Sequence, residues 1–237
     1  MSISIIVPTL NEEAFIKPFL EHLRERAAGA EVIVADGGST DQTTQQATPL
    51  AHRVVHSKAG RAVQMNAGAR AASGEILWFL HADATVPLAC LNDIDQIMSN
   101  PRIVGGFFRI RLPSSQPIYR LTDSFAHYAG ILLRMRCGDH GIFCRRSAFE
   151  KLGGFPTVPL MEDVEFFRQL RRNGRVAYSD KRIIVSPRRY ESVGAARSTL
   201  TYGLIATLYI CGISLPRLAR IYQRTCCAAH DGTTLPV

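Results

Sequence analysis

The chain has 237 residues, 46% of them hydrophobic and 20% charged, with a formal net charge of +8. This composition is typical of a globular protein with an ample core. No unbroken apolar run is long enough for a transmembrane helix, and the apolar segment at residues 2–7 ends at Pro8, too early for a signal peptide. We therefore expect a cytoplasmic protein.

The charge is unevenly distributed. Residues 1–100 carry 7 basic and 11 acidic side chains, and residues 101–237 carry 21 and 9, so that the net charges are −4 and +12. A basic second half favours phosphate-bearing or membrane-surface partners, although solvated surface arginines explain the same count. Nucleic acid is not an expected partner, because no RNP, KH or helix-turn-helix pattern is present.

The first half alternates apolar strands with helical patterns, which predicts a parallel, doubly wound sheet. Polar or glycine-rich turns follow Val7, Ala35 and Leu80, and we expect all three at one sheet edge, where they form a cleft. The strands are predicted at residues 3–7, 31–35, 53–56 and 76–80, and the helices at 12–28, where Pro18 indicates a later start, and at 60–72.

The triplet His81-Ala82-Asp83 follows the most continuous apolar strand, residues 76–80. A carboxylate at this edge of a buried sheet costs desolvation unless a metal or hydrogen-bond donors meet it. A metal or phosphate site is one interpretation, and an aspartate that opens the turn before Pro87 is the other.

The second half is less regular. The pattern predicts a half-exposed strand at residues 105–112, an amphipathic helix at 114–136 and a helix that Pro159–Asp163 opens and Gly174 ends. The other predicted elements are helices at 88–99 and 147–152, a strand or loop at 138–145, strands at 176–179 and 182–186, and an apolar segment at 199–215 followed by three arginines at helical spacing.

Six short motifs occur in a fixed order over residues 3–190. They read IIVPTLNEE, VIVADGGSTD, GRAVQMNAG, LHAD, GGF and MEDVEF. Together they resemble a family 2 glycosyltransferase of the GT-A fold, and most closely a soluble bacterial subgroup associated with radical-SAM and selenium-linked domains. The resemblance implies one α/β GT-A domain at residues 1–198, with a Rossmann-like nucleotide-sugar half at 1–100, an acceptor half at 101–198 and an apolar helical extension at 199–237.

The resemblance implies a nucleotide site made of residues from the first three motifs. A carboxylate after a strand can accept a hydrogen bond from an imide N–H of uracil, and a guanidinium suits phosphate oxygens. The family's usual Asp-Asp-Gly is Asp36-Gly37-Gly38 here, so one carboxylate is missing. The implied nucleotide-binding residues are Pro8, Asn11, Glu12, Asp36 and Arg61, although Arg61 also suits a helix-start surface position.

His81-Ala82-Asp83 aligns with the family's Asp-x-Asp, whose last carboxylate ligates a divalent metal. Asp83 keeps that carboxylate and His81 replaces the first. Imidazole suits manganese better than magnesium, so the expected cofactor is Mn²⁺ in preference to Mg²⁺.

Glu162-Asp163 matches the acidic pair that supplies the catalytic base, and family position favours Asp163. Acidic residues in a first helical turn also have a plain structural use, because they face the positive end of the helix dipole. The resemblance further implies a sugar or acceptor pocket at Gly153, Gly154 and His140, and a loop carrying Arg189 and Arg197 that closes over the diphosphate. A structural histidine is an equal interpretation of His140.

The expected activity is inverting transfer of a sugar from a nucleotide-diphosphate donor, UDP-linked, to an unidentified glycan, lipid or small-molecule hydroxyl. The alternatives are a non-catalytic nucleotide-sugar-binding or partner protein and a nucleotidyltransferase. The segment 199–224 either packs as a buried helix or homodimer contact, or lies on the inner face of a membrane with its arginines toward anionic lipid.

Overall fold

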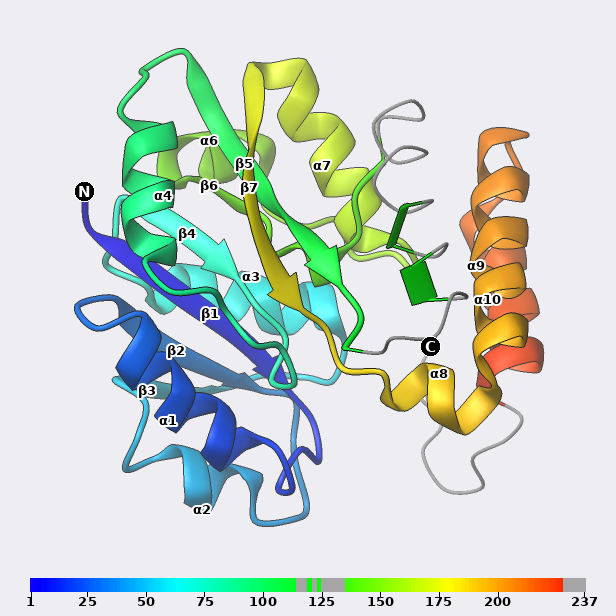
Figure 1. The fold of residues 1–237 in the computed structure, drawn as a ribbon, viewed down its shortest axis with the longest axis horizontal. Helices are drawn as coiled ribbons and strands as arrows, with labels where there is room; N and C mark the ends of the chain where they lie inside the picture. The colour runs from blue at the N-terminus through cyan, green and yellow to red at the C-terminus, as the bar shows by residue number, and fades with distance from the viewer. Residues whose placement is uncertain (114–118, 121–122, 125–134, 228–237) are drawn as a thin grey trace.

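A computed structural model describes residues 1–113, 119–120, 123–124 and 135–227 (Figure 1). One seven-stranded sheet with the order β3-β2-β1-β4-β6-β5-β7 runs through both halves of the sequence. All of its neighbouring strands are parallel except for β6, which is antiparallel to both β4 and β5. The strands are β1 (Ile3–Thr9), β2 (Glu31–Asp36), β3 (Arg53–His56), β4 (Ile76–Phe79), β5 (Ile103–Arg111), β6 (Phe143–Arg145) and β7 (Arg175–Ile184).

Helices cover both faces of the sheet, and the side chains of β1 alternate between them. Ile5 and Val7 pack with one layer, and Ile6 packs with the other. The first layer contains α1 (Ile16–Arg26), α2 (Thr43–Ala47) and α4 (Cys90–Met98), and the second contains α3 (Arg61–Ala71), α6 (Arg146–Leu152) and α7 (Glu162–Asn173). A sheet buried on both faces explains why β1, β2 and β4 read as continuous apolar runs.

The predicted mostly parallel α/β fold is therefore confirmed, and the strands and helices of the first half lie within a few residues of their predicted bounds. The helix after β1 begins at Ile16, later than residue 12, as Pro18 indicated. Strands form in the first half where continuous runs of branched apolar residues fill both faces of the sheet. Helices form where apolar residues recur every three to four positions.

Two predictions for the second half are wrong, and a third holds only in part. Residues 176–179 and 182–186 do not form two strands, because a single strand, β7, pairs with β5 throughout and absorbs an irregularity between Phe108 and Arg109. Strand β5 is half-exposed only in part, since Gly105 to Phe108 are all buried in this interior strand, whereas Arg111 is exposed. The segment predicted as a loop carrying Arg189 and Arg197 forms instead the short helix α8 (Arg188–Val193) and the start of the next helix, α9 (Ala195–Ile210). The helix predicted at 114–136 falls largely outside the described residues.

The described part of the chain ends in helices α9 and α10 (Leu215–Tyr222), which lie against each other, and in the π-helical turn Gln223–Cys227 (Figure 1). Tyr209 of α9 donates a hydrogen bond to Glu165 of α7, which ties the extension to the sheet domain. Leu200 is 74% exposed, so the apolar segment is only partly buried. Among the described residues, no helix combines the length and apolarity needed to cross a membrane. Burial, a dimer contact and a lipid contact therefore stay predictions.

Candidate active site

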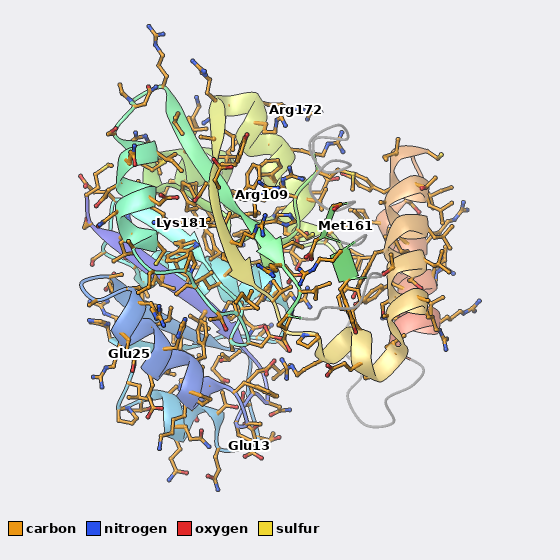
Figure 2. All side chains as sticks on the ribbon, in the orientation of Figure 1. Glu13, Glu25, Arg109, Met161, Arg172 and Lys181 are labelled. Atoms are coloured by element: carbon orange, nitrogen blue, oxygen red, sulfur yellow. The ribbon has the colours of Figure 1, made fainter. Side chains whose placement is uncertain are left out.

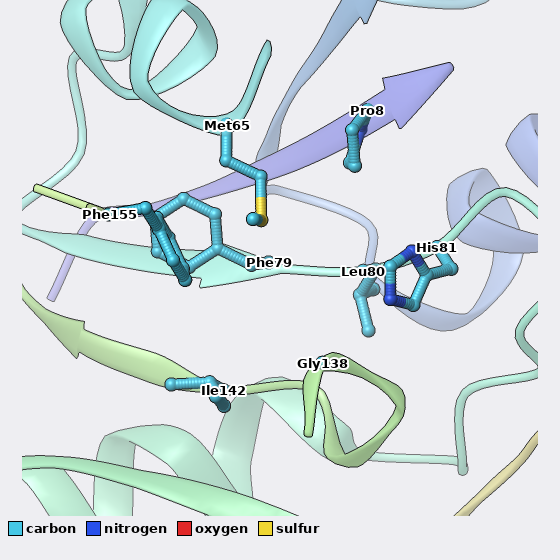
Figure 3. A pocket seen from close by; sticks show the side chains of 8 residues that line it. All are labelled: Pro8, Met65, Phe79, Leu80, His81, Gly138, Ile142 and Phe155. Carbon is cyan, nitrogen blue, oxygen red and sulfur yellow. The ribbon is translucent and has the colours of Figure 1, made fainter. Parts of the chain in front are cut away.

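Strands β1, β2 and β4 are neighbours, so their carboxyl ends open at one edge of the sheet. Thr9 lies beside Asp36 in the register, and the turn of His81 begins just after β4. This juxtaposition brings the first, second and fourth sequence motifs together. A small apolar pocket lies beneath them, with His81 and Leu80 at one end and Phe79 and Phe155 at the other (Figure 3). Its lining residues are Pro8, Met65, Phe79, Leu80, His81, Gly138, Ile142 and Phe155.

The Asp36 side chain is buried, and the structure uses its carboxylate to hold the loop that follows β2. Oδ2 accepts hydrogen bonds from the backbone N–H of Gly38 at 3.0 Å and of Ser39 at 3.1 Å, and Oδ1 accepts from the Ser39 hydroxyl at 2.5 Å. The Nδ1 atom of His56 lies 3.5 Å from Oδ2. Asp36 therefore shapes this loop, and its contact with a uracil ring stays a prediction.

Asn11 joins the loops after β1 and β2. Its backbone is left-handed, with a φ of 53°, a conformation that asparagine tolerates better than most residues. Its Oδ1 accepts from the N–H of Thr40 at 2.9 Å, and its own N–H donates to the Ser39 hydroxyl at 2.9 Å. The next N–H, that of Glu12, donates to the Thr43 hydroxyl at 2.8 Å. These bonds set the two loops side by side.

Gln64 was not identified from the sequence, yet its buried amide ties these strand ends together. Its Nε2 donates to the carbonyl oxygens of Thr9 at 2.6 Å and Ala35 at 3.1 Å. A Cβ at Gly37 would lie 2.9 Å from the Gln64 Cδ atom. The position where the family usually has a second aspartate is thus filled by the Gln64 side chain, which explains the glycine. A polar residue within an alanine-rich helix was the only sequence signal.

Asp83 lies in a cluster of charged side chains. Its Oδ2 is 2.9 Å from the Nη2 atom of Arg188, and the same nitrogen is 3.3 Å from Oε2 of Glu12. Burial raises the pKa of Glu12, and the Arg188 charge opposes that rise. Arg188 belongs to α8, and the sequence indicated its neighbourhood but not its partners.

The predicted metal position at Asp83 and His81 has few protein donors of its own among the described residues. Asp83 already has a cation as its partner, so the surroundings favour positive charge. The Nε2 atom of His81 lies 3.6 Å from Oδ1 of Asp139. Within the described part of the chain, no three histidine, cysteine or acidic side chains gather closely enough to hold a metal alone. The residues thus fit a divalent ion that one protein carboxylate and phosphate oxygens hold together, as magnesium and manganese commonly are.

Asp163 and Glu162 begin helix α7, after Met161 has turned the chain with a φ of 65° (Figure 2). The Asp163 carboxylate is buried, and its Oδ2 accepts a hydrogen bond from the N–H of Gly138. Burial and, next, the charge of Glu162 raise the pKa of Asp163 to about 7, while the Gly138 bond and Arg61 oppose the rise. A carboxyl group with such a pKa can take a proton near neutral pH.

Gly138 separates Asp163 from His81. A Cβ at this glycine would lie 2.7 Å from Nε2 of His81 and 3.4 Å from Oδ2 of Asp163. The predicted base and the predicted metal position are therefore neighbours on either side of one backbone segment. Arg61, at the start of α3, completes this side of the site with Nη1 4.0 Å from Oε1 of Glu162.

Gly153 and Gly154 end helix α6 with φ values of 77° and 81°. A Cβ at Gly154 would lie 2.5 Å from Oδ1 of Asn66, whose amide holds both backbone polar groups of Phe155 at 2.8 Å. These glycines thus position Phe155 at the pocket, and a direct sugar contact stays a prediction. His140 is buried, and its ring makes an edge-to-face contact with that of Phe107; a contact with donor or acceptor stays a prediction.

The two arginines predicted to close over the diphosphate lie in different helices. Arg189 is in α8, and its side chain is outside what the structure describes. Arg197 is exposed in the first turns of α9. Arg188 is the member of this segment whose described side chain reaches the donor edge.

Comparisons with known proteins agree with this fold. The solved structure of S. aureus TarS 1–349 in complex with UDP-GlcNAc superposes with a TM-score of 0.65 at 19% identity, covering 88% of this chain and 67% of that one. The mannosyltransferase PcManGT from Pyrobaculum calidifontis, in complex with GDP-Man and Mn²⁺, superposes with a TM-score of 0.69 at 22% identity, covering 96% and 73%. At these identities the likeness shows the GT-A fold.

Sequence comparison identifies relatives and a family. The PGL/p-HBAD biosynthesis glycosyltransferase of Mycobacterium bovis (strain BCG / Pasteur 1173P2) is 36% identical over 166 residues, which are 64% of this chain. The chain spans only 62% of the length of that relative. The profile described as Glycosyl transferase family 2 matches residues 4–153, well over half of the sequence. The chain therefore belongs to glycosyl transferase family 2.

Proposed function

We propose that this protein transfers a sugar from a UDP-linked donor to a hydroxyl group of an acceptor with inversion at the anomeric carbon. The observation that carries the proposal is the buried Asp163 carboxyl, with a pKa raised to about 7, beside the sheet edge where the donor motifs meet. In an inverting transfer a single carboxylate takes the acceptor proton as the hydroxyl attacks. The complex of TarS with UDP-GlcNAc supports a UDP-sugar donor.

The donor would lie along the carboxyl ends of β1, β2 and β4. Asn11 and Asp36 hold the two loops that would contact the base, and Arg61 offers a guanidinium for phosphate oxygens. Asp83 would hold a divalent metal together with the diphosphate, and the metal, when bound, stabilises the charge of the departing nucleotide. We favour manganese, which accompanies GDP-Man in the PcManGT complex.

His81 adds an interpretation that differs from metal ligation. Its Nε2 faces Asp139 and the Gly138 backbone, next to Asp163. In this position the imidazole would line the space between the donor phosphates and the catalytic base Asp163. Asp83 would then be the protein's single metal ligand. This arrangement leaves magnesium acceptable as well, because the metal would then have oxygen ligands only.

Two other functions remain to be distinguished from transfer. A non-catalytic nucleotide-sugar-binding protein is compatible with the replacement of two family aspartates by Gly37 and His81. A nucleotidyltransferase is disfavoured, because those enzymes usually place a glycine-rich, basic loop after the first strand, where this chain has Pro8–Glu13. Donor binding without any transfer or hydrolysis would favour the binding protein.

The acceptor side is proposed only in general terms. A glycan, a lipid and a small molecule all supply the hydroxyl that the reaction needs. The curated relative's name refers to PGL/p-HBAD biosynthesis, and the partial length match keeps its substrates from being carried over directly. A membrane surface or a second copy of the chain, contacted through α9 and α10, is a further proposed partner, and a cytoplasmic location, peripheral at the membrane if lipid binds, accompanies it.

Calorimetric titration tests the donor site. UDP and GDP are titrated with and without Mn²⁺ into wild type, Asp83→Asn and Asp95→Asn. Asp95 is the matched control, because it pairs with the N-terminal amino group at the opposite edge of the sheet. We expect Mn²⁺-dependent binding of UDP that Asp83→Asn loses and Asp95→Asn keeps. Absence of binding of both nucleotides under every condition would overturn the donor-site proposal.

A further inference from the structure

Arg188 is held at the donor edge by three separate groups. Its Nη2 lies 2.9 Å from Oδ2 of Asp83, and Nη1 and Nη2 both lie 3.3 Å from Oε2 of Glu12. The guanidinium carbon is 3.8 Å from the centroid of the Phe15 ring, which adds a cation–π contact. A side chain that is merely solvated has no such set of partners, so the structure has a built cation site here.

The two carboxylates of this site come from distant parts of the chain. Glu12 follows β1 and Asp83 follows β4, the neighbouring strand of the sheet. The positions close to both acids are therefore favourable for positive charge, whichever group supplies it. Because arginine stays protonated under all ordinary conditions, Arg188 cannot release these carboxylates by losing its charge. It can release them only by moving.

A divalent metal on Asp83 would bind the same carboxylate group that Arg188 binds through Oδ2. Metal–carboxylate distances are about 2.0–2.6 Å, so a metal and the guanidinium on this one carboxylate would lie within roughly 5 Å of each other with like charges. Asp83 cannot serve both well. We propose that Arg188 and the divalent metal are alternative occupants of the cation site formed by Glu12 and Asp83, so that the metal enters by displacing the guanidinium.

This inference rests on the proposed function, since it concerns the metal of the donor site. It also gives α8 a role. The helix begins at Arg188 and joins β7 to α9 (Figure 1), so release of the guanidinium frees the connection between the sheet and the C-terminal helices. Arg188 is thus a positioning residue that links metal entry to the placement of this connection.

The experiment is calorimetric titration of Mn²⁺, once without nucleotide and once with UDP at a fixed saturating concentration, because the diphosphate supplies further oxygen ligands. It compares wild type with Arg188→Gln, Arg188→Lys and the control Arg217→Gln, an exposed arginine of α10. We expect Arg188→Gln to bind Mn²⁺ about tenfold more tightly than wild type, the ratio that corresponds to one lost competing charge-assisted hydrogen bond. Arg188→Lys should gain less, since lysine keeps the competing positive charge and loses only the planar fork, and Arg217→Gln should match wild type.

Unchanged or weaker Mn²⁺ binding in Arg188→Gln would overturn the inference, and if that variant does not fold by circular dichroism, Arg188→Lys decides in the same way. The double variant Arg188→Gln/Asp83→Asn should not bind Mn²⁺ more tightly than wild type. Tighter Mn²⁺ binding by this double variant would also overturn the inference. Titration of UDP in the presence of Mn²⁺ separates this result from the proposed function. If UDP binds only with Mn²⁺ but substitution of Arg188 does not raise the affinity for Mn²⁺, the donor-site proposal stands and the competition is refuted. If substitution raises the affinity for Mn²⁺ but no nucleotide binds, the competition stands and the donor-site proposal is refuted.

Discussion

The buried carboxyl of Asp163 predicts a pH-dependent stability that can be measured without knowing any substrate. Its pKa is about 7, against an ordinary value of 3.8. Between these values the folded chain holds a proton that the unfolded chain has released. The free energy of unfolding therefore falls as pH rises from about 4 to about 7, and the contribution of Asp163 is lost above its folded pKa.

The size of the effect follows from the same difference. At about 1.4 kcal/mol for each pKa unit, the whole change is at most about 4 kcal/mol, of which about 3 kcal/mol falls between pH 5 and pH 8. Asp163→Asn removes the ionisation and keeps an oxygen that can accept from the N–H of Gly138. Wild type should therefore lose up to this amount relative to Asp163→Asn over that range.

The assay is urea unfolding of wild type, Asp163→Asn and the control Asp180→Asn at half-unit steps from pH 5 to pH 8. Asp180 is suitable because its side chain is 87% exposed, and its variant should run parallel to wild type. Parallel curves for wild type and Asp163→Asn would refute the reasoning, because they would mean that this carboxyl is ionised in the folded state throughout.

The same ionisation should appear in catalysis once a donor and acceptor are known. A general base works as the carboxylate, so kcat/KM should rise by up to about tenfold per pH unit below about 7 and level off above it. Asp163→Asn should lose about 10²–10⁴-fold without losing UDP binding. If another residue is the catalytic base, the pH dependence of transfer will not follow the pH dependence of stability, and the prediction fails.

Three further substitutions test the surroundings of the site. Gly138→Ala should lower transfer about 100-fold while UDP still binds, because its Cβ would lie 2.7 Å from Nε2 of His81, and displacements of about 1 Å have effects of that size; near-normal transfer would show that the segment adapts. Gly37→Asp should lower the melting temperature and not tighten UDP binding, since its Cβ would lie 2.9 Å from Cδ of Gln64; tighter binding would contradict the packing explanation. Gln64→Leu should lower the free energy of unfolding in urea by about 1–3 kcal/mol, because two buried carbonyl oxygens lose their donor; wild-type stability would exclude that bond as a structural tie.

The first half of the fold was predictable because its information is local. In a parallel unit each apolar run is one strand and the turn after it lies at the carboxyl edge. Asp36 and Asp83 could thus be placed at one edge from the sequence. The second half lacks this regularity, because β6 inserts antiparallel between β4 and β5 and β7 passes through an irregularity. Neither feature leaves a periodic signal, and β7 was consequently divided in two.

Motifs located the acidic pair at Glu162 and Asp163, but they could not show what surrounds it. The pKa of Asp163 depends on burial and on a hydrogen bond from Gly138, which is 25 residues away in the chain. The partners of Arg188 are more distant still, at separations of 105 and 176 residues. Contacts of this kind are set by tertiary packing, so a sequence read alone can name the groups and not their pairing.

The departures from the family pattern become intelligible when they are taken with their neighbours. Gly37 lacks a carboxylate because the amide of Gln64 occupies the space and ties β1 to β2. His81 stands in place of the first aspartate of the pair and faces Asp139, and Asp83 pairs with Arg188, which Glu12 also binds. The two carboxylates that the family usually has are thus absent from a site whose acids Asp83 and Glu12 both pair with Arg188 of α8. For this reason a single reversion such as His81→Asp is expected to add negative charge beside Asp139, and a donor site closer to the family pattern would require His81, Asp139 and Arg188 to change together.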